Sequence, residues 1–303
     1  MNTRLGWVGF ALLLSLLVLA AGGKAILHDT LDPDSFWHLR VADQLTAQGI
    51  GPLVDNLSFA SLKTPWTPYS WLAELGMKFV WDEGSYRAAV AVQSILVAAI
   101  IALMASAALT RTTPHAPLLG VTVATAVGGY LALPYLSFRP VTGALVGLAG
   151  AMWLLVRDRH RDERSQGAWL LIPLCALLIN VHPFALVIPC WTVMLLCGAI
   201  WELIRSPRDS YRPEMHRRAK RYLLLTALCA LACCASPMLP GLVRGLPRFG
   251  FGDPMVRANF IVELRPVYAG LDGLIPGVLL LLAISMMLAR RQRYRAAEWL
   301  WLA

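Results

Sequence analysis

Charged residues are scarce in this chain of 303 residues, where Asp, Glu, Lys and Arg together make up 15% of the sequence. A soluble protein carries about a quarter of its residues as charged side chains. Hydrophobic residues make up 57%, and several apolar runs approach or exceed the ~20 residues that a helix needs to cross a bilayer. The composition therefore excludes an ordinary soluble protein and predicts an all-α polytopic membrane protein.

Cysteines in the pattern of a metal site or a disulfide framework are also lacking, because all six lie inside apolar runs. Such cysteines are expected to be small buried apolar residues. The chain also shows no internal repeat and no low-complexity linker, which predicts a single transmembrane domain over residues 1–303. The cysteines are Cys175, Cys190, Cys197, Cys229, Cys233 and Cys234.

Positive charge is present in excess, and its placement indicates topology. A net charge of +9 would suggest a nucleic-acid partner in a soluble protein, but here Lys and Arg cluster in particular loops. Cytoplasmic loops of membrane proteins are enriched in Lys and Arg. We therefore expect no nucleic-acid partner, and place the N-terminus and the basic loops 157–164, 205–221 and 290–295 in the cytoplasm.

The apolar runs predict eight membrane segments and the start of a ninth at AAEWLWLA. This ending leads us to expect that a C-terminal portion is missing or that the reading frame ends early. The first run is longer than the apolar core of a signal peptide, so it is expected to stay as a membrane helix. The eight segments cover about 5–27, 88–110, 116–135, 141–156, 168–180, 184–201, 223–239 and 274–289.

The first outward-facing loop, residues 28–87, is acidic and is expected to contain two interfacial helices. One is predicted to be capped by Asp34 or Ser35 and to stop at Gly49. The other is predicted to begin at Thr67 and Pro68 and to end at Gly84. Their apolar stripes suit helices that lie in the membrane interface. The stripes are Trp37, Val41 and Leu45 in the first helix, and Leu72, Leu75 and Phe79 in the second.

Two carboxylates, Asp32 and Asp34, open this loop within the stretch HDTLDPDSFWHL. They are expected at the end of a membrane helix, where a partly desolvated carboxylate is a better proton acceptor. Two carboxylates at this spacing could also share a divalent cation. A plain role for Asp34 as a helix cap is the competing interpretation, and the residues alone leave both open.

The other outward loops carry a few polar residues that lie close to apolar segments. Arg139 in SFRP could bind a phosphate or could anchor the chain at the interface. His182 in NVHP could relay a proton, bind a metal ion or be a satisfied structural residue. The basic excess of loop 240–272, which includes Arg265, would suit a phosphate-bearing substrate, although generic surface charge explains it as well.

Tryptophans and one further carboxylate of loop 28–87 have similarly mixed interpretations. Trp37 and Trp71 could line a saccharide or lipid site, but tryptophan is enriched at membrane interfaces whatever the function. Glu74 precedes Lys78 by four residues, which is typical of a helix-surface ion pair. Glu74 is therefore expected to be structural unless it belongs to a site.

The order of these features resembles the GT-C superfamily of glycosyltransferases, in the bacterial branch related to protein mannosyltransferases and lipid A aminoarabinose transferases. DPDSFWHLRVADQL resembles the acidic motif of that superfamily followed by an aromatic helix, and PWTPYSWLAEL resembles its second interfacial helix. SFRP, NVHPF, ASPMLPG and NFIVELRP are similar to later landmarks. The resemblance covers about residues 5–289.

This resemblance implies hexosyl or pentosyl transfer from a polyprenyl-phosphate sugar donor to a lipid, glycan or protein acceptor. It implies a multi-pass protein of the bacterial inner membrane, with a cytoplasmic N-terminus and a periplasmic active face. Asp34 matches the expected catalytic base or metal ligand, with Asp32 beside it. Arg139 and Arg265 match donor-phosphate ligands. The residues expected around the substrate cavity are Trp37, His38, Trp71, Glu74, Asn180 and His182.

Two other functions fit the same sequence. A transporter or flippase for lipid-linked saccharides would use the acidic and basic loops for binding. It would also need ionisable residues in mid-membrane, and the apolar segments contain almost none. A non-catalytic scaffold for envelope assembly would tolerate the loss of the Asp34 carboxylate.

Overall fold

The computed structural model describes residues 8–9, 11–13, 15–16, 19, 31–57, 62–110, 118–132, 136–205, 212–247 and 274–289. Most of the predicted segment 5–27, the start of the ninth segment and Arg265 lie outside these residues. The fold is mostly helical, which confirms the all-α class. The chain divides into two compact units, Met1–Ile188 with Leu228–Met238, and Pro189–Ala227 with Leu239–Ala303.

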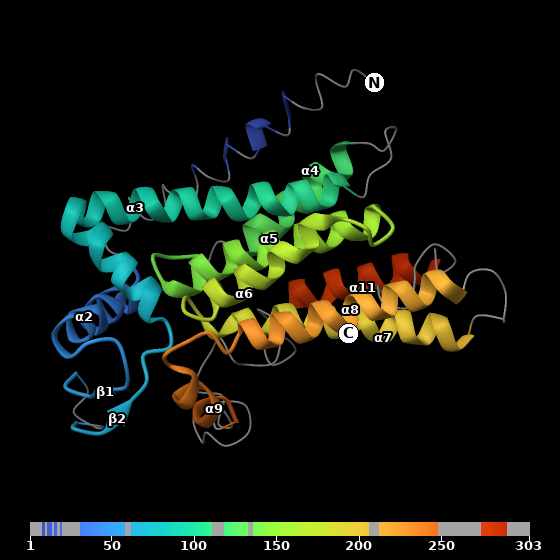
Figure 1. The fold of residues 1–303 in the computed structure, drawn as a ribbon. Coiled ribbons are helices and arrows are strands. Elements are labelled where there is room, and N and C mark those ends of the chain that lie inside the picture. The colour runs from blue at the N-terminus through green and yellow to red at the C-terminus, as the bar shows by residue number, and fades with distance from the viewer. Residues whose placement is uncertain are drawn as a thin grey trace. The chain divides into compact units, whose positions relative to one another are not determined.

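The first unit contains most of the elements in the chain, and its centre is the packing of α5 against α3 (Figure 1). Gly147 of α5 has no side chain, so Leu178 of α6 lies directly against the α5 backbone. The elements are α2 (Pro33–Gln48), β1 (Leu53–Val54), β2 (Pro65–Trp66), α3 (Trp71–Thr110), α4 (Leu118–Ala132), α5 (Pro140–His160), η2 (Gln166–Leu170), α6 (Leu171–Leu178) and η3 (Pro183–Leu186).

Helix α2 begins earlier than its sequence predicts. The cap is Asp32, whose side chain accepts a hydrogen bond from the Asp34 N–H at 3.0 Å. The prediction of Asp34 or Ser35 was therefore wrong. Proline has a fixed φ and no N–H, so Pro33 suits the first turn of the helix and leaves the cap to the residue before it. The predicted stop at Gly49 is confirmed, since Gly49 has φ of +90° and ends the helix.

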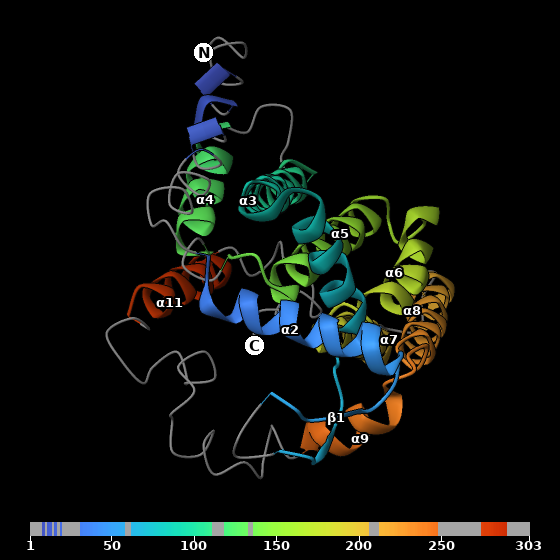
Figure 2. The same ribbon diagram turned by 90° about the vertical axis from the view of Figure 1, so that its left-hand side faces the viewer.

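The apolar stripe of α2 is largely used inside the protein. Val41 and Leu45 are buried in one cluster with Leu53 of β1 and Met238, while Trp37 stays exposed. Figure 2 looks along the long section of α3, and α2 runs across this view. The helix thus lies crosswise to α3, and its buried face contacts protein.

Helix α3 runs for 40 residues and bends at Ser85, where φ is +50° and ψ is −140°. The bend lies directly after the predicted end at Gly84, and the section beyond it contains the predicted apolar segment 88–110 (Figure 1). A Cβ on Gly84 would lie 2.6 Å from the Cβ of Ala88, so the bend needs glycine there.

The first section of α3 differs from its prediction in two ways. It begins at Trp71, because β2 pairs with β1 as far as Trp66 and a turn follows. The predicted start at Thr67 and Pro68 was wrong for this reason. Phe79, which was predicted in the apolar stripe, is exposed, whereas Glu74 and Met77 are buried.

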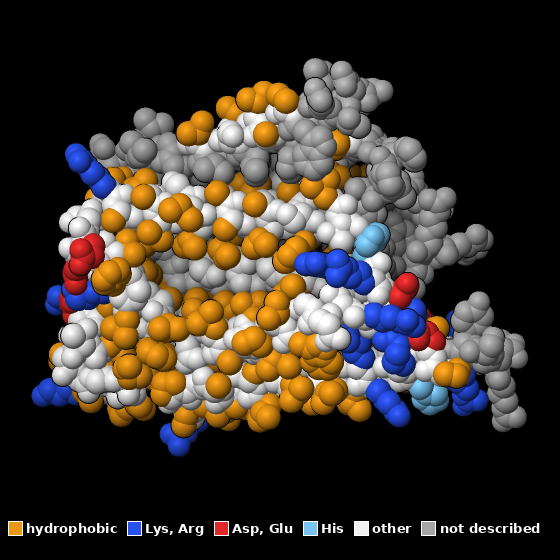
Figure 3. All heavy atoms as spheres, turned by 45° about the horizontal axis from the view of Figure 1, so that its top comes forward, with side chains coloured by type: hydrophobic (Ala, Val, Ile, Leu, Met, Phe, Trp, Pro, Cys, Tyr) orange, Lys and Arg blue, Asp and Glu red, His pale blue; other side chains and the backbone are white. Residues whose placement is uncertain are grey.

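Three of the described helical segments are long and apolar enough to cross a membrane. They are α3, α5 and the η3–α7 segment Pro183–Arg205, whereas α4 and the segment Gln166–Leu178 are shorter. On the face shown in Figure 3, apolar side chains cover the middle and charged side chains gather toward the ends. Membrane insertion is thus supported for three of the eight predicted segments.

The second unit contains parts of two helices that start or end in the first unit. In this unit α7 and α8 run antiparallel, because Thr226 Oγ1 donates to Thr192 Oγ1 at 2.9 Å and Arg218 lies 3.9 Å from Glu202. The helices are α7 (Val187–Arg205), α8 (Arg212–Ala232), α9 (Leu239–Pro247) and α11 (Leu274–Ala289).

The six cysteines are free thiols, and their burial is mixed. Three are buried in the first unit, as predicted for small apolar residues. The expectation was wrong for the other three, which are exposed, two of them on α7 and one in the turn after α8. The buried thiols are Cys175, Cys229 and Cys233, and the exposed ones are Cys190, Cys197 and Cys234.

Candidate functional site

Arg139 forms an ion pair with the acidic pair at the start of α2. Its Nη1 lies 2.5 Å from Asp34 Oδ2, and its Nε lies 3.7 Å from Asp32 Oδ2. The Arg139 side chain is 15% exposed, whereas that of Asp34 is 60% exposed. A guanidinium that is partly buried thus faces two carboxylates, one of which remains accessible to solvent.

The turn before α5 holds Arg139 in this position. Arg139 is the N-cap residue of α5 with extended backbone, and Pro140 follows in the first turn of the helix. Thr142 Oγ1 donates to the Ser137 carbonyl at 2.6 Å and closes the turn. The Ser35 hydroxyl of α2 donates to the Phe138 carbonyl at 2.7 Å, in a buried contact. This turn is therefore fixed both internally and to α2.

His38 of α2 pairs with Glu74 of α3. Its Nδ1 lies 3.0 Å from Glu74 Oε1, and the Glu74 side chain is only 4% exposed. Glu74 lies before the bend at Ser85, outside the apolar section of α3. Burial raises the pKa of Glu74, and the hydrogen bond and charge of His38 oppose this rise. Its second oxygen, Oε2, is buried and has no hydrogen-bond partner among the described residues.

Lys78 does not pair with Glu74, so the predicted pair at helix spacing was wrong. Lys78 instead lies 3.1 Å from Asp43 of α2 and 2.9 Å from Asp82 on its own helix. Glu74 faces the buried side of α3, whereas Lys78 and Asp82 lie toward solvent. The side on which each residue lies therefore decides the pairing, and Lys78 adds a second connection between α2 and α3.

His182 lies beside these groups at the start of η3. Its Nδ1 accepts a hydrogen bond from the Phe184 N–H at 3.2 Å, so it acts as the cap of this short helix. Burial, together with the positive charges of His38 and Arg139, lowers the pKa of His182 to about 4. His182 is therefore neutral near pH 7, and its ring packs edge-on against Phe184 at 4.4 Å between centroids.

Asn180 and the tryptophans predicted around the cavity contact other residues of the same chain. Asn180 Oδ1 accepts from Trp71 Nε1 at 2.8 Å, and its Nδ2 donates to the carbonyls of Ala176 and Ala235. Trp37 lies 6.3 Å from Trp66 between ring centroids. The polar groups of Asn180 thus hold three segments of the first unit together next to the site.

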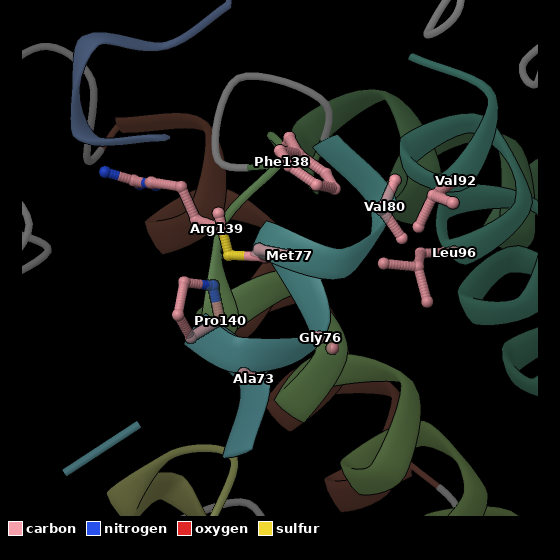
Figure 4. Close-up of a pocket in the computed structure, with 10 residues that line it drawn as sticks. Ala73, Gly76, Met77, Val80, Val92, Leu96, Phe138, Arg139 and Pro140 are labelled. Carbon is pink, nitrogen blue, oxygen red and sulfur yellow. The ribbon is translucent and has the colours of Figure 1, made fainter. Parts of the chain in front are cut away.

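An apolar pocket of about 160 Å³ lies beside Arg139. Its walls come from the first section of α3, from α3 beyond the bend and from the start of α5 (Figure 4). In this view Phe138, Met77 and Val80 stand around the hollow, and the guanidinium of Arg139 extends away from them. The pocket is lined by residues from both sides of the bend at Ser85 and from the start of α5, so no local sequence pattern could have predicted it.

The acidic pair, Asp32 and Asp34, faces the guanidinium of Arg139. Among the described residues, no group of three or more His, Cys, Asp and Glu side chains could hold a metal ion. A divalent cation at Asp32 and Asp34 would have to displace the guanidinium of Arg139, and the second predicted phosphate ligand, Arg265, lies outside the described residues.

Comparison with protein-family models, with curated proteins and with solved structures found no match for this chain. The chemistry of the site therefore follows from its own residues. Six of the predicted site residues lie in one region of the first unit, namely Asp32, Asp34, His38, Glu74, Arg139 and His182. Together they offer one guanidinium, one largely exposed carboxylate at Asp34 and an adjacent apolar pocket.

Proposed function

We propose that this chain is a membrane glycosyltransferase that moves a sugar from a polyprenyl-phosphate donor to an acceptor hydroxyl. The observation that carries the proposal is the position of Arg139, which both lines the apolar pocket and faces Asp32 and Asp34. A lipid phosphate needs an apolar surface for its chain and a fork of N–H donors for its head group. The pocket offers the apolar surface, and the guanidinium of Arg139, which lines the pocket, offers the N–H donors.

Arg139 has donor capacity left for a phosphate. Its Nη1 donates to Asp34, but its Nε makes no hydrogen bond to a described residue. A phosphate that binds the guanidinium would replace one carboxylate with a doubly accepting anion of matching geometry. Asp34, which is largely exposed, would then be released toward the bound donor. In this scheme Asp34 is either the base, as the family resemblance implies, or a holder of Arg139.

The proposed enzyme acts at the outer face of the bacterial cytoplasmic membrane. Helix α5 has 21 residues, so its two ends lie about 30 Å apart, close to the thickness of a bilayer core. Arg139 precedes one end, and the basic run from Arg157 to Arg164 occupies the other. Positive loops favour the cytoplasm, so the acidic site faces the periplasm. A cytoplasmic N-terminus and eight segments with the start of a ninth belong to this proposal.

The test uses the full chain in proteoliposomes with a radiolabelled polyprenyl-phosphate sugar and acceptor lipids. We expect the wild type to bind the donor and transfer the sugar. Replacing Arg139 by Gln removes a hydrogen bond between charged groups, so donor binding should weaken by about 10- to 100-fold. Lys78→Gln is the matched control, because it breaks an ion pair between α2 and α3 that does not involve Arg139.

Three outcomes would contradict the proposal. Equal donor binding by wild type and Arg139→Gln would remove the phosphate role. Movement of the donor across the bilayer without sugar transfer would indicate a flippase. The absence of both donor binding and sugar transfer would favour a scaffold.

A further inference from the structure

The geometry of His38 is that of an oriented proton acceptor. Its Nδ1 lies 3.0 Å from Glu74 Oε1, and its Nε2 makes no hydrogen bond to any described residue. When Nδ1 carries the hydrogen and donates it to the carboxylate, Nε2 keeps its lone pair. An imidazole held at one nitrogen by a carboxylate is a common arrangement for a general base, because the carboxylate fixes the tautomer and stabilises the imidazolium.

A purely structural role does not account for the burial of the Glu74 carboxylate. A buried carboxylate is costly unless its charge is matched, and Lys78, which could match it at helix spacing, pairs with Asp43 and Asp82 instead. Oε1 of Glu74 is used by His38, and Oε2 is left buried without a described partner. Such an oxygen can accept a hydrogen bond from a ligand hydroxyl, and the charge of Glu74 can stabilise a proton that arrives on His38.

Asp34 differs from His38, because its carboxylate already has a charged partner. Its carboxylate already has Arg139 at 2.5 Å, so its negative charge is matched in the protein. The lone pair of His38 Nε2 has no such partner among the described residues. Both side chains project from the first two turns of α2, and His182 lies within electrostatic range of both His38 and Arg139. A donor phosphate on Arg139 and an acceptor hydroxyl at His38 would therefore be neighbours.

We propose that His38 accepts the proton of the attacking hydroxyl, that Glu74 positions it, and that Asp34 holds Arg139 until the donor phosphate binds. This assignment rests on the proposed glycosyl transfer. The acceptor oxygen forms a bond to the anomeric carbon, and the bond from that carbon to the phosphate oxygen breaks. The electron pair stays on the phosphate, which faces Arg139, and the acceptor proton moves to His38 Nε2.

Two titratable groups from other segments act on His38. Glu74 of α3 contacts its ring, and His182 before η3 lies within electrostatic range. Arg139, which is paired with Asp32 and Asp34, lies within electrostatic range of His182. Of these, Glu74 is the group in direct contact with the His38 ring. Loss of the Glu74 charge should therefore affect the His38 ring most.

The experiment measures kcat and the donor KM in proteoliposomes between pH 5 and pH 9. His38→Asn should lower kcat by about 100-fold or more, because general bases contribute about 10²- to 10⁴-fold. Added imidazole should restore part of this rate, which a purely structural role would not allow. Asp34→Asn should change the donor KM and leave kcat within a few-fold of the wild type.

Glu74→Gln keeps an acceptor for His38 Nδ1 and removes the charge. It should lower kcat and move the acidic limb of its pH profile to lower pH, because the imidazolium loses its anionic neighbour. Asp43→Asn is the matched control, since it breaks the Lys78 contact between the same two helices and should leave both parameters unchanged.

The assignment would be overturned on its own if the wild type transfers sugar and His38→Asn keeps its kcat. It would also be overturned if Asp34→Asn, and not His38→Asn, loses about 100-fold in kcat. A wild type that binds no donor and transfers no sugar overturns the proposed function, and the role of His38 with it. If His38→Asn fails to fold, the pH profile of kcat for Glu74→Gln tests the assignment instead. An acidic limb at the wild-type position would then reject the roles given to His38 and Glu74.

Discussion

Two clusters of charge lie at opposite ends of α5, and they are built in different ways. At the C-terminal end, Arg159 pairs at 3.1 Å with Glu163 in the turn that follows the helix, and their side chains are only 6% and 1% exposed. At the N-terminal end, Arg139 meets Asp34 of α2, 105 residues earlier in the chain. The first cluster is local and closed, whereas the second is assembled from distant segments and remains open to solvent.

The local cluster closes a tight turn. The Asp158 carboxylate accepts a hydrogen bond from the Ser165 N–H at 2.8 Å, and Asp162 and Glu163 both have positive φ. Non-glycine residues adopt this conformation at a cost that surrounding contacts must offset. The charges at this end therefore stabilise the turn, while those at the other end remain partly exposed to solvent. The difference separates a cluster that stabilises a turn from the cluster to which we assign the proposed function.

The largest effect on stability is expected from breaking the local cluster. Arg159→Leu would remove the ion pair of the buried Glu163 carboxylate with Arg159, which costs about 3–5 kcal/mol of unfolding free energy. Chemical unfolding in detergent measures this loss. Donor binding per folded molecule should stay at the wild-type level, and a loss below about 1 kcal/mol would contradict the role given to this ion pair.

The next effect concerns pH and the open cluster. The pKa of His182 is about 4 in the folded protein, against an ordinary value of 6.5, so the unfolded chain binds more protons between these values. Stability from neutral His182 is present above pH 6.5 and is lost as the pH falls toward 4, by up to about 3 kcal/mol.

His182→Asn keeps a capping acceptor for η3 but does not titrate, so its stability should vary less between pH 6.5 and 4. Thermal unfolding across this range measures the slope. His160→Asn, at the other end of α5 and exposed, is the control and should keep the wild-type slope. An unchanged slope in His182→Asn would show that its surroundings, His38 and Arg139 included, do not disfavour its charge.

A smaller effect is expected from the bend that brings Glu74 to the open cluster. Gly84→Ala places a Cβ 2.6 Å from that of Ala88, and such overpacking costs about 1–3 kcal/mol. Thermal unfolding in detergent measures the loss. Gly120→Ala in α4 has open space and should instead gain up to about 1 kcal/mol. Equal effects at the two glycines would show that the bend is not tightly packed.

The smallest effect separates the cap from the charge at the start of α2. Asp32→Ala should cost about 1 kcal/mol, because the Asp34 N–H loses its acceptor. Asp32→Asn keeps that acceptor and should cost only a few tenths of this value, since the Arg139 contact at 3.7 Å is long. Denaturant unfolding compares the two, and equal losses would mean that Asp32 acts through its charge.

Local patterns predicted those features that depend on neighbours in the chain. The end of α2 at Gly49 follows from the freedom of glycine to adopt positive φ. The predicted helix end at Gly84 is instead a bend within α3, where the positive φ falls on Ser85. The start of α3 was missed because the β1–β2 pairing extends past the predicted cap, and such pairing depends on a strand 11 residues away.

The residues of the site were predicted, but their partners were not. Asp32, Asp34 and Arg139 were each recognised by type and position, yet nothing in the sequence indicated that the carboxylates and the guanidinium would pair. The sequence suggested Lys78 for Glu74, since helix neighbours at spacing four usually meet. In the structure Glu74 pairs with His38, because Glu74 faces the inside of the unit and Lys78 does not.

By itself, the sequence determined that the chain is helical and apolar, that it is basic in some loops and acidic in one, and that a few residues could carry chemistry. Composition and short-range periodicity suffice for these features, because they depend on the chain and its solvent. Only the tertiary structure decided that Arg139 lies between an apolar pocket and two carboxylates, and that His38 faces a buried Glu74. Such contacts depend on the packing of α2, α3 and α5, which brings together residues that no local pattern connects.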